Sequence, residues 1–448
     1  MRRVLIMGAG KSGVAAANFL AGREVDVSIT DAKREEELPL ASSIDPRVHR
    51  VLGEQSSALL DGADLVVLSP GIPPDVPLLM EAHARSLPVI SEIELAFRHL
   101  QGKVVAITGS NGKSTTTALI GEILKVAGYE PIVAGNIGEP LIGSIDPTRS
   151  RHYVIELSSF QLETVESFHA DVALLLNITP DHMDRYRSME EYAAAKLRIF
   201  RNQAATDTAI VNADDVRTST PPTPARVWRF SSRHPVDRGA WLEGEALAVS
   251  LGDEDRRIPR SALRIEGTAN VENALAAWLA ARAMGIGDVD VQIAFGSFTG
   301  LPHRMVKVRE LDGVRWINDS KGTNVDATVK SLEGMPDGRV ILILGGKDKK
   351  GEFERLRDLV SRKARNVLTI GTAAGRVEEA LAGTVEIVPC GDMNRAVEWA
   401  HSHAAERDVV LLSPACASFD QYRNFEQRGE HFEELVRGLR EGAREGDR

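Results

Sequence analysis

A turn punctuated by glycines is the part of this sequence best suited to bind a phosphate. Residues 104–118 read VVAITGSNGKSTTTA, so an apolar strand leads through Gly109 and Gly112 to Lys113 and Ser114. Glycines let backbone N–H groups approach an anion, the helix start adds partial positive charge, the lysine reaches terminal phosphates and the serine hydroxyl binds Mg²⁺. The spacing is shorter than in the usual P-loop, and the alternative is a tight strand-to-helix turn with a chance Lys-Ser pair.

A carboxylate and an imidazole follow in the same chain region. Glu156 lies among the apolar residues of a predicted strand at 152–157. Because a buried carboxylate is costly unless it is paired or binds metal, Glu156 is a candidate Mg²⁺ ligand or catalytic base. A salt-bridged structural glutamate is the alternative. His182 follows a predicted strand at 172–178 in the segment TPDHMD, and a histidine there, taken singly, is more often an ordinary loop histidine.

A lysine interrupts the apolar face of the next predicted helix, residues 189–200. Met189, Tyr192, Lys196 and Phe200 are spaced three or four positions apart, so they share one face. Lys196 either extends along this face to water or is neutralised or modified inside a site. The spacing alone does not decide between these alternatives.

The N-terminus carries a second glycine-rich turn. Residues 3–7 read as a buried parallel strand followed by GAGKSG, and the strand at 25–30 ends at Asp31, where a dinucleotide fold places its ribose-binding acid. The alternatives are an NAD-type site, a site for another nucleotide and a turn without ligand. A stiff loop, SPGIPP, follows the predicted strand at 64–68, and open α/β sheets bind ligands at such strand ends.

Repeated β-α units must position these groups. The Pro-rich and alternating stretch at 216–264 predicts antiparallel hairpins, and the helix that follows shows an apolar stripe of Val271, Leu275, Trp278 and Leu279. In the last third, polar clusters follow predicted strands at 305–310, 314–318, 340–344, 366–370 and 408–412. We therefore expect a third parallel sheet with these clusters at one edge.

Bulk properties limit the class of protein. A chain of 448 residues predicts about three domains, and a net charge of -10 without a long basic run argues against nucleic acid as a partner. No stretch of about eighteen apolar residues predicts a membrane span. Two cysteines, Cys390 and Cys416, cannot build a disulfide framework, so we expect a reducing cytoplasm.

A series of segments in order along nearly the whole chain resembles the Mur ligases: TGSNGKSTTT, GNIG, ELSSFQLE, NITPDHMDRY, AAAKLRIF, GLPHR, NDSKGTN and SPACASFDQYRNFEQRG. The resemblance implies an α/β protein of three domains. These are an N-terminal Rossmann-like domain at 1–91 that binds the UDP substrate, a central P-loop ATPase domain with a mostly parallel sheet at 92–298, and a C-terminal Rossmann-like domain at 299–448 that binds the incoming amino acid. A monomer acting on small molecules in the cytoplasm is expected.

The resemblance also implies the reaction, an ATP-dependent amide ligation that adds D-glutamate to UDP-N-acetylmuramoyl-L-alanine in peptidoglycan precursor synthesis. ATP activates the substrate carboxylate as an acyl phosphate, which the amine of D-glutamate attacks. The implied catalytic residues are Lys113, His182, Lys196 and Glu156. The implied ligands of two Mg²⁺ ions are Ser114, Glu156, His182 and Lys196, the last as a carbamate formed with CO₂.

Matched positions imply the remaining contacts. Those to ATP are Gly109, Ser110, Asn111, Gly112, Lys113, Ser114, Thr115, Thr116, Asn270, Asn273, Arg304 (to the γ-phosphate) and Asp319. Those to the UDP substrate, which replaces NAD in the N-terminal domain, are Lys11, Ser12, Gly13, Asp31, Ala32, Lys33, Gly71, Asn136, Ser159, Gln161 and His182. Ala32 and Lys33 depart from the Thr-Arg pair often found after the acid. Those to D-glutamate are Lys321, Thr323, Lys349, Ser418 and Phe425.

Some alternatives stay open at this point. In the basic turn at 347–350, Lys347 could replace Lys349, or the turn could simply be solvated. Within the same reaction class, the acceptor could be L-glutamate or the substrate a folate-like acid. From a different class, a non-catalytic nucleotide-binding module, such as an NAD sensor built on the first domain, is the rival hypothesis.

Overall fold

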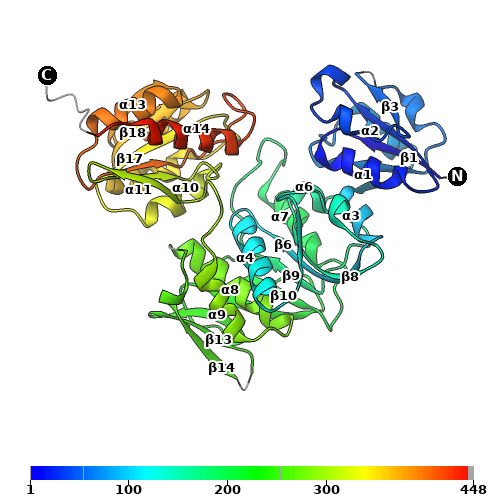
Figure 1. Ribbon diagram of the computed structural model, residues 1–448, viewed down its shortest axis with the longest axis horizontal. Helices are drawn as coiled ribbons and strands as arrows, with labels where there is room; N and C mark the ends of the chain where they lie inside the picture. The colour runs from blue at the N-terminus through cyan, green and yellow to red at the C-terminus, as the bar shows by residue number, and fades with distance from the viewer. Residues whose placement is uncertain (1, 54, 253, 266, 442–448) are drawn as a thin grey trace. The chain divides into compact units, whose positions relative to one another are not determined.

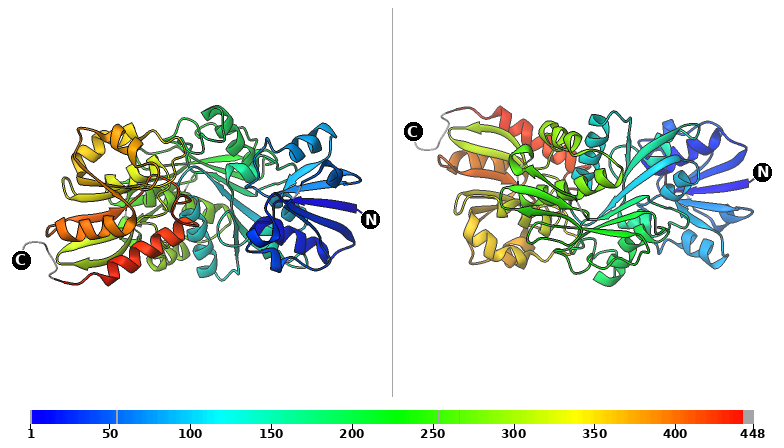
Figure 2. Two further views of the ribbon diagram at one scale, coloured as in Figure 1. Left: turned by 90° about the horizontal axis from the view of Figure 1, so that it is seen from above. Right: turned by 90° about the horizontal axis from the view of Figure 1, so that it is seen from below.

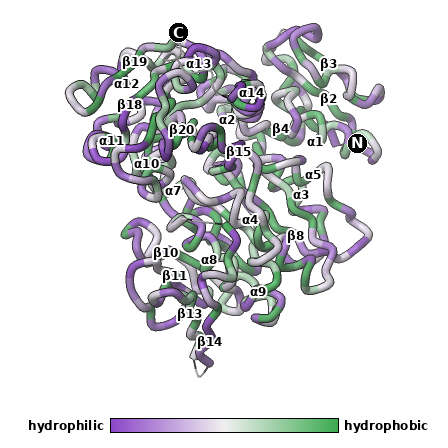
Figure 3. The backbone as a smooth tube through the Cα atoms, turned by 60° about the vertical axis from the view of Figure 1, so that its left-hand side comes forward, coloured by the Kyte–Doolittle hydropathy of each residue, from purple (hydrophilic) through white to green (hydrophobic). Residues whose placement is uncertain are grey.

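The computed structural model describes residues 2–53, 55–252, 254–265 and 267–441, which form an α/β fold with three sheets that follow one another along the chain (Figure 1). The sheets have five, nine and six strands in these residues. Strand segments at the centre of each sheet are largely hydrophobic (Figure 3). The chain divides into two compact units, residues 1–178, 190–264 and 271–298 in the first and 179–189, 265–270 and 299–448 in the second.

The N-terminal sheet is parallel throughout, with the order β3-β2-β1-β4-β5. Its elements are β1 (Arg2–Met7), α1 (Lys11–Ala21), β2 (Val25–Asp31), β3 (His49–Leu52), β4 (Leu65–Leu68), α2 (Pro77–Ala84), β5 (Val89–Ser91) and α3 (Glu92–Phe97). The order of the strands reverses between β1 and β4. The loops after these two strands therefore meet at the switch point where such sheets bind ligands.

The central sheet has the order β14-β13-β12-β11-β10-β9-β6-β8-β7. Its strands are β6 (Gln101–Thr108), β7 (Ile132–Gly135), β8 (Ser150–Glu156), β9 (Val172–Leu175), β10 (Thr208–Asn212), β11 (Arg226–Ser231), β12 (Gly239–Glu243), β13 (Ala246–Ser250) and β14 (Asp255–Pro259). The prediction of antiparallel hairpins is right for β12 to β14 and wrong for β11, which pairs in parallel with β10 and β12. The Pro-rich stretch is thus a crossover between parallel strands, since its length suits a crossover better than a hairpin turn.

Helices of the central region are α4 (Lys113–Val126), α5 (Leu141–Ser144), α6 (Ser159–Leu162), α7 (Met189–Leu197) with the 3₁₀ turn η4 (Arg198–Phe200), α8 (Thr268–Ala283) and α9 (Asp288–Ser297). The single apolar stripe predicted for α8 is incomplete. Ala276, Ala277 and Ala280 lie outside that stripe and are fully buried, so the middle of α8 is enclosed on all sides.

The C-terminal sheet has the order β15-β16-β20-β17-β18-β19. Its elements are β15 (Val306–Leu311), β16 (Val314–Asn318), α10 (Val325–Glu333), β17 (Val340–Gly345), α11 (Arg357–Lys363), β18 (Ala364–Ile370), α12 (Ala374–Leu381), β19 (Glu386–Gly391), α13 (Met393–His403), β20 (Val409–Leu412) and α14 (Phe425–Gly438). Within the described residues of this sheet, β15 pairs antiparallel with β16 and the other neighbouring strands pair in parallel. Helices cover both faces of the sheet (Figure 2), and a separate apolar core fills each face. Among the described residues, none of the helices has the length and apolar character needed to cross a bilayer.

Candidate active site

Two glycines shape the turn between β6 and α4. Gly109 has φ 154° and Gly112 has φ 85°, and Gly112 is the N-cap residue of α4. A Cβ atom on Gly112 would lie 2.4 Å from Oδ1 of Asn273 on α8. Only glycine fits there, because a side chain would both strain the backbone and displace the asparagine. The turn and α8 are therefore in close contact at this position.

Asn177, which follows β9, holds the turn from the other side. Its Oδ1 accepts the backbone N–H of Asn111 at 2.8 Å, its Nδ2 donates to the carbonyl of Asn111 at 3.0 Å, and its own carbonyl accepts the N–H of Ser110 at 2.9 Å. β9 ends at Leu175 instead of the predicted Ile178, which frees Asn177 for this role. Sequence reasoning assigned no role to Asn177, although a polar residue directly after an apolar strand is a usable signal.

Two lysines converge on this turn. Lys113 Nζ donates to the carbonyls of Gly109 and Ser110, both at 2.9 Å, and Lys196 Nζ donates to the carbonyl of Gly109 at 2.8 Å. Lys196 is only 2% exposed, so the alternative that it extends to water is wrong. Tyr192 accompanies it, with its ring centroid 4.7 Å from Lys196 Nζ and its hydroxyl 3.1 Å from Ser110 Oγ. The predicted face of α7 thus packs on the glycine-rich turn between β6 and α4.

Glu156 lies at the carboxyl end of β8, where its register partner on β6 is Ile107. It is 1% exposed, and its Oε1 accepts Nδ2 of Asn136 at 2.8 Å. Its Oε2 is buried without a hydrogen-bond partner, and within the described residues no ion pair satisfies Glu156, so the salt-bridge alternative is wrong. A buried carboxylate oxygen that lacks a donor is a position that a cation would satisfy.

The residues present therefore fit a bound Mg²⁺ ion. Ser114, the second residue of α4, is 3% exposed. No group of three or more His, Cys, Asp or Glu side chains gathers into a metal cage in the part of the chain that the structure describes. Mg²⁺ is commonly held by one or two carboxylates together with substrate phosphates, so a single glutamate beside a phosphate turn is a suitable donor set.

The other predicted ATP contacts divide between the two units. Thr116 Oγ1 donates to Oδ1 of Asn273 at 3.2 Å, and Thr115 Oγ1 is buried without a hydrogen-bond partner, both in the first unit. Asn270, Arg304 and Asp319 belong to the second unit.

The buried carboxylate of Asp319 lies near the partly buried side chain of Arg304 in the second unit. Asp319 is 3% exposed, and its Oδ2 accepts the hydroxyls of Ser331 at 2.6 Å and Ser413 at 2.8 Å. Burial raises the pKa of Asp319, while the hydroxyl bonds and the charge of Arg304 act in the opposite direction. The Nε of Arg304 is buried without a hydrogen-bond partner, which suits an arginine that receives an anionic ligand.

The N-terminal turn is ordered by Asp31. Its Oδ2 accepts the N–H of Ala9 at 2.8 Å, and its Oδ1 accepts the N–H of Lys33 at 3.0 Å. A Cβ atom on Gly13 would lie 1.8 Å from the carbonyl of Gly8, so α1 begins in direct contact with the turn. Around this turn the side chains of Lys11, Ala32 and Lys33 and the backbone of Gly71 are exposed, and Ser12 is partly buried.

Asp181 and Lys349 form an ion pair in the second unit. Lys349 Nζ lies 3.1 Å from Asp181 Oδ1, and Asn324 Nδ2 donates to Asp181 Oδ2 at 3.1 Å. These residues line a pocket with Thr323 and Arg355. Lys347 is exposed, and its backbone forms an antiparallel bridge with Ala417 instead of lining this pocket.

His182 and the muramoyl-contact candidates occupy distinct elements. His182 belongs to the second unit and adopts φ 57°, a left-handed conformation that is uncommon outside glycine. Ser159 and Gln161 lie in the first unit on α6, each 2% exposed. Gln161 Oε1 accepts the N–H of Ser158 at 2.9 Å, which closes a capping box at the start of α6.

The start of α14 gathers the remaining candidates. Lys321 Nζ lies 4.3 Å from the ring centroid of Phe425, and Ser418 is 2% exposed. Arg428, which sequence reasoning did not single out, is 1% exposed and donates to the carbonyls of Ser320 at 2.8 Å and Cys416 at 3.1 Å. Burial lowers the pKa of Arg428 to about 10. This arginine ties the loops after β16 and β20 together.

Comparisons with known proteins agree with this arrangement. Three family models match successive parts of the chain: the Mur ligase MurD-like N-terminal domain over residues 2–91, the Mur ligase middle domain over 107–281 and the Mur ligase glutamate ligase domain over 303–416. A curated protein of Solibacter usitatus is 45% identical over 98% of both chains. One of Acidobacterium capsulatum is 44% identical over 97% of this chain and 96% of its own. Both are named UDP-N-acetylmuramoylalanine–D-glutamate ligase.

Solved structures share the fold. A pseudomurein peptide ligase type C from Methanothermus fervidus has a TM-score of 0.64 at 19% identity and covers 98% of this chain and 100% of its own. MurF ligase from Thermotoga maritima in complex with ADP has a TM-score of 0.62 at 18% identity, over 94% of this chain and 99% of its own. Family models along the chain and near full-length relatives at more than 40% identity establish that the chain belongs to the Mur ligase family.

Proposed function

We propose that this chain is an ATP-dependent ligase that joins D-glutamate to UDP-N-acetylmuramoyl-L-alanine in peptidoglycan precursor synthesis. The names of its relatives support the substrate pair. The observation that carries the reaction class is the convergence of Lys113 and Lys196 on Gly109 of the glycine turn, with the buried Glu156 in register with Ile107 on the strand that leads into this turn. Such a cluster suits a reaction in which several negative charges must be brought together.

The chemistry requires two displacements. The carboxylate of the muramoyl-alanine attacks the γ-phosphorus of ATP, and the bond to the bridging oxygen breaks to release ADP. The amine of D-glutamate then attacks the acyl carbon, the amide forms, the amine loses a proton and inorganic phosphate leaves. Phosphoryl transfer asks the protein chiefly for positioning and charge stabilisation, which Lys113 and the N–H groups at the start of α4 provide.

We assign the metal and the modified lysine as follows. Ser114, Glu156, His182 and Lys196 as a carbamate hold two Mg²⁺ ions, and the orphaned Oε2 of Glu156 supports this assignment. When bound, Mg²⁺ neutralises the phosphate oxygens. Carbamylation would convert the buried ammonium of Lys196 into an anion, which removes a cation from a site where it lies beside that of Lys113.

Substrate contacts follow the matched positions. ATP binds at residues 109–116 together with Asn270, Asn273, Arg304 and Asp319. The uridine nucleotide binds at Lys11, Ser12, Gly13, Asp31, Ala32, Lys33 and Gly71, and the muramoyl end binds near Asn136, Ser159, Gln161 and His182. D-glutamate binds at Lys321, Thr323, Lys349, Ser418 and Phe425. Lys349 lines the pocket and Lys347 does not, which favours Lys349 as the contact to D-glutamate.

We further propose the domain bounds 1–91, 92–298 and 299–448, a monomeric enzyme and a cytoplasmic location. Each bound falls between successive sheets, since β5 ends at Ser91, and α9 ends at Ser297 before β15 begins. The supply of ATP and the two free, buried cysteines suit a cytoplasmic location.

Phosphate release tests the function. The purified protein is incubated with Mg²⁺, ATP, UDP-N-acetylmuramoyl-L-alanine and D-glutamate, and each substrate is then omitted in turn. Phosphate should appear only with all three substrates. Replacement of D-glutamate by L-glutamate, or of the nucleotide sugar by a folate, distinguishes the rival ligases. Absence of phosphate with the full set, together with tight NADH binding and no UDP binding, would instead support a nucleotide-binding module.

A further inference from the structure

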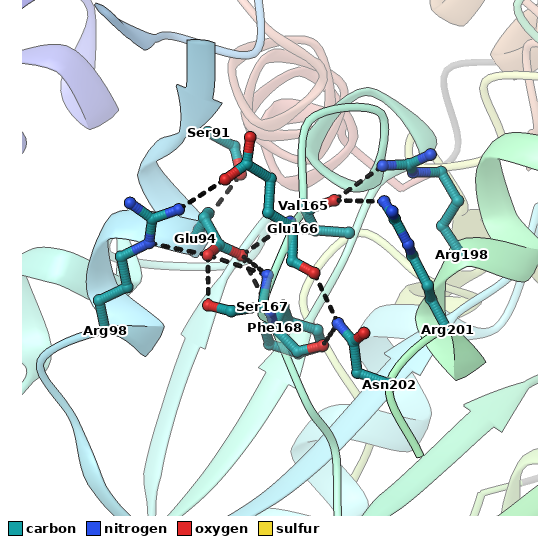
Figure 4. A network of polar contacts seen from close by, with 10 residues as sticks. All are labelled: Ser91, Glu94, Arg98, Val165, Glu166, Ser167, Phe168, Arg198, Arg201 and Asn202. Atoms are coloured by element: carbon teal, nitrogen blue, oxygen red, sulfur yellow. Dashed lines mark hydrogen bonds and ion pairs between the residues drawn. The ribbon is translucent and has the colours of Figure 1, made fainter. Parts of the chain in front are cut away.

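An irregular segment, residues 163–168, runs from Leu162, the last residue of α6, toward the loop before β9, and we call it the strap. It pairs with no strand, yet Val165 and Phe168 are almost fully buried. Backbone groups removed from water need partners, so a buried irregular segment must obtain them from side chains. Figure 4 shows that the strap obtains its partners from two different directions.

Glu94 supplies the acceptors for the strap. This residue of α3 is fully buried, and its carboxylate accepts the backbone N–H of Glu166 at 3.0 Å, of Ser167 at 3.1 Å and of Phe168 at 2.9 Å. The hydroxyl of Ser167 also donates to it. Arg98, the C-cap residue of α3, donates Nε to Glu94 Oε1 at 2.9 Å from the solvent side. One carboxylate thus satisfies three consecutive backbone donors.

The segment that follows Lys196 supplies the donors. Arg198 donates to the carbonyl of Leu162 at 2.8 Å and of Val165 at 2.7 Å. Asn202 Nδ2 donates to the carbonyls of Glu166 and Phe168, both at 2.8 Å. Arg201 adds a longer bond of 3.4 Å to Val165. Because Arg198 lies directly after α7, the strap is bound to the helix that carries Lys196.

We propose that Glu94 is a positioning residue for the ligase reaction, which through the strap fixes α6 and the Lys196 helix relative to each other. This inference rests on the proposed function, since α6 carries the candidate muramoyl contacts Ser159 and Gln161. Lys196 adjoins the phosphate-binding turn. Loss of the Glu94 carboxylate should therefore affect the nucleotide-sugar substrate and the chemical step, and leave the D-glutamate contacts unaffected.

Glutamine cannot replace Glu94 in this role. Burial raises the pKa of Glu94, but the bonds from Ser167, Glu166 and Arg98 outweigh burial, so the pKa is lowered and the group is ionised. An amide has one acceptor oxygen and an NH₂ group that would face backbone N–H donors. At least one donor of the strap would then be buried without a partner.

The test compares Glu94→Gln with a matched control, Asp408→Asn. Asp408 is also fully buried and accepts a backbone N–H, that of Ala405 at 2.8 Å, and an arginine, Arg365, at 2.6 Å. It precedes β20, at the opposite end of that strand from the polar loop that begins at Ser413. Both variants should lose thermal stability, so kinetics are measured well below both melting temperatures.

For Glu94→Gln we expect kcat/KM for the nucleotide sugar to fall by about tenfold or more, while KM for D-glutamate stays within about twofold of wild type. Asp408→Asn should change kcat/KM for the nucleotide sugar by less than about twofold. If the two variants give the same kinetic constants once corrected for folded fraction, the inference is overturned. Wild-type turnover is measured first, because its absence would refute the proposed function and not the role of Glu94.

A second variant keeps the inference testable if Glu94→Gln does not fold. Asn202 is exposed, and Asn202→Ala removes its two hydrogen bonds to the strap on the side opposite Glu94. It should lower kcat/KM for the nucleotide sugar in the same direction and by a smaller factor. In the double variant the two effects should be less than multiplicative, because both residues act through the strap. Unchanged kinetics in Asn202→Ala, or strictly multiplicative effects, would contradict the proposal.

Discussion

Lys113 and Lys196 donate to the same carbonyl oxygen, that of Gly109, at 2.9 Å and 2.8 Å. One lysine begins α4 and the other lies near the end of α7, so residues far apart in the chain bring two cations to one atom. Two ammonium groups so close repel each other, and the repulsion is relieved when a phosphate binds or when one lysine becomes an anion. The contact explains why a lysine, Lys196, lies on the apolar face of α7, because that face packs on the glycine-rich turn.

Lys196→Ala should lower turnover by about a hundredfold or more, because the variant cannot carry a carbamate. A short carboxylic acid added to the assay should partly restore turnover by placing an anionic oxygen in the space left by the side chain. Lys347→Ala, at an exposed lysine, serves as the control. Its turnover should stay near that of wild type, and the added carboxylic acid should not alter it. Full activity of Lys196→Ala would contradict the assigned role.

Gly112→Ala should raise KM for ATP by about tenfold and lower the melting temperature, since the new Cβ would lie 2.4 Å from Asn273 Oδ1. Gly128→Ala is the matched control, because Gly128 has the same φ of 85° but no atom within 4 Å of its Cβ position. Both variants carry the backbone strain of about 1 kcal/mol, and only Gly112→Ala disturbs the turn. Equal ATP affinities in the two variants would show that the Asn273 contact is unimportant.

Lys349→Ala should raise KM for D-glutamate by about tenfold, whereas Lys347→Ala should leave it within about twofold. Lys349 lines the pocket and pairs with Asp181, while Lys347 is exposed. A partly buried cation opposite a dicarboxylate contributes more binding energy than a fully solvated one. Steady-state kinetics with D-glutamate varied at saturating ATP and nucleotide sugar measures both variants. The reverse ranking would assign the contact to Lys347.

Glu92 should make stability depend on pH. Burial raises the pKa of Glu92 from 4.5 to about 7, although its bond from the N–H of Ile142 acts in the opposite direction. The pKa of Glu92 is higher in the folded state than in the unfolded state. The contribution of Glu92 to folding stability is therefore present in full below about pH 4.5 and is lost as the pH rises through about 7. The loss amounts to about 3 kcal/mol.

Glu92→Gln should remove this dependence. Between pH 5 and pH 8 the melting temperature of the wild type should fall relative to that of the variant, as scanning calorimetry would measure. Glu81→Gln, at a carboxylate whose side chain is 43% exposed, is the control and should follow the wild type. Parallel curves for wild type and Glu92→Gln would contradict the raised pKa.

The three-domain α/β fold was predictable because its signals are local. Apolar runs of strand length, each followed by glycine or a polar cluster, predicted most strands of the three sheets, and the family resemblance predicted their division. The direction in which neighbouring strands pair was not predictable from such local signals. Whether β11 lies parallel or antiparallel to β12 depends on where its neighbours lie in the sheet, and the Pro-rich stretch beside it is compatible with either arrangement.

Residue types at the candidate site were also visible in the sequence, whereas their surroundings were not. The apolar stripe around Lys196 identified an anomaly and left two explanations open. Only packing showed that its Nζ reaches Gly109 and not water. Glu94 had no distinguishing pattern, because a hydrogen bond to a distant backbone group leaves no spacing along the chain.

The sequence by itself therefore determined the family, the glycine-rich turn and the residue types able to do chemistry, since these depend on short segments with their own physical preferences. Tertiary structure decided which carboxylates are buried and what they bind. Glu92 and Glu94 lie two residues apart on α3, yet burial dominates at Glu92 and raises its pKa, while hydrogen bonds dominate at Glu94 and lower its pKa. The difference arises from residues 142 and 166–168, which only folding brings to these side chains.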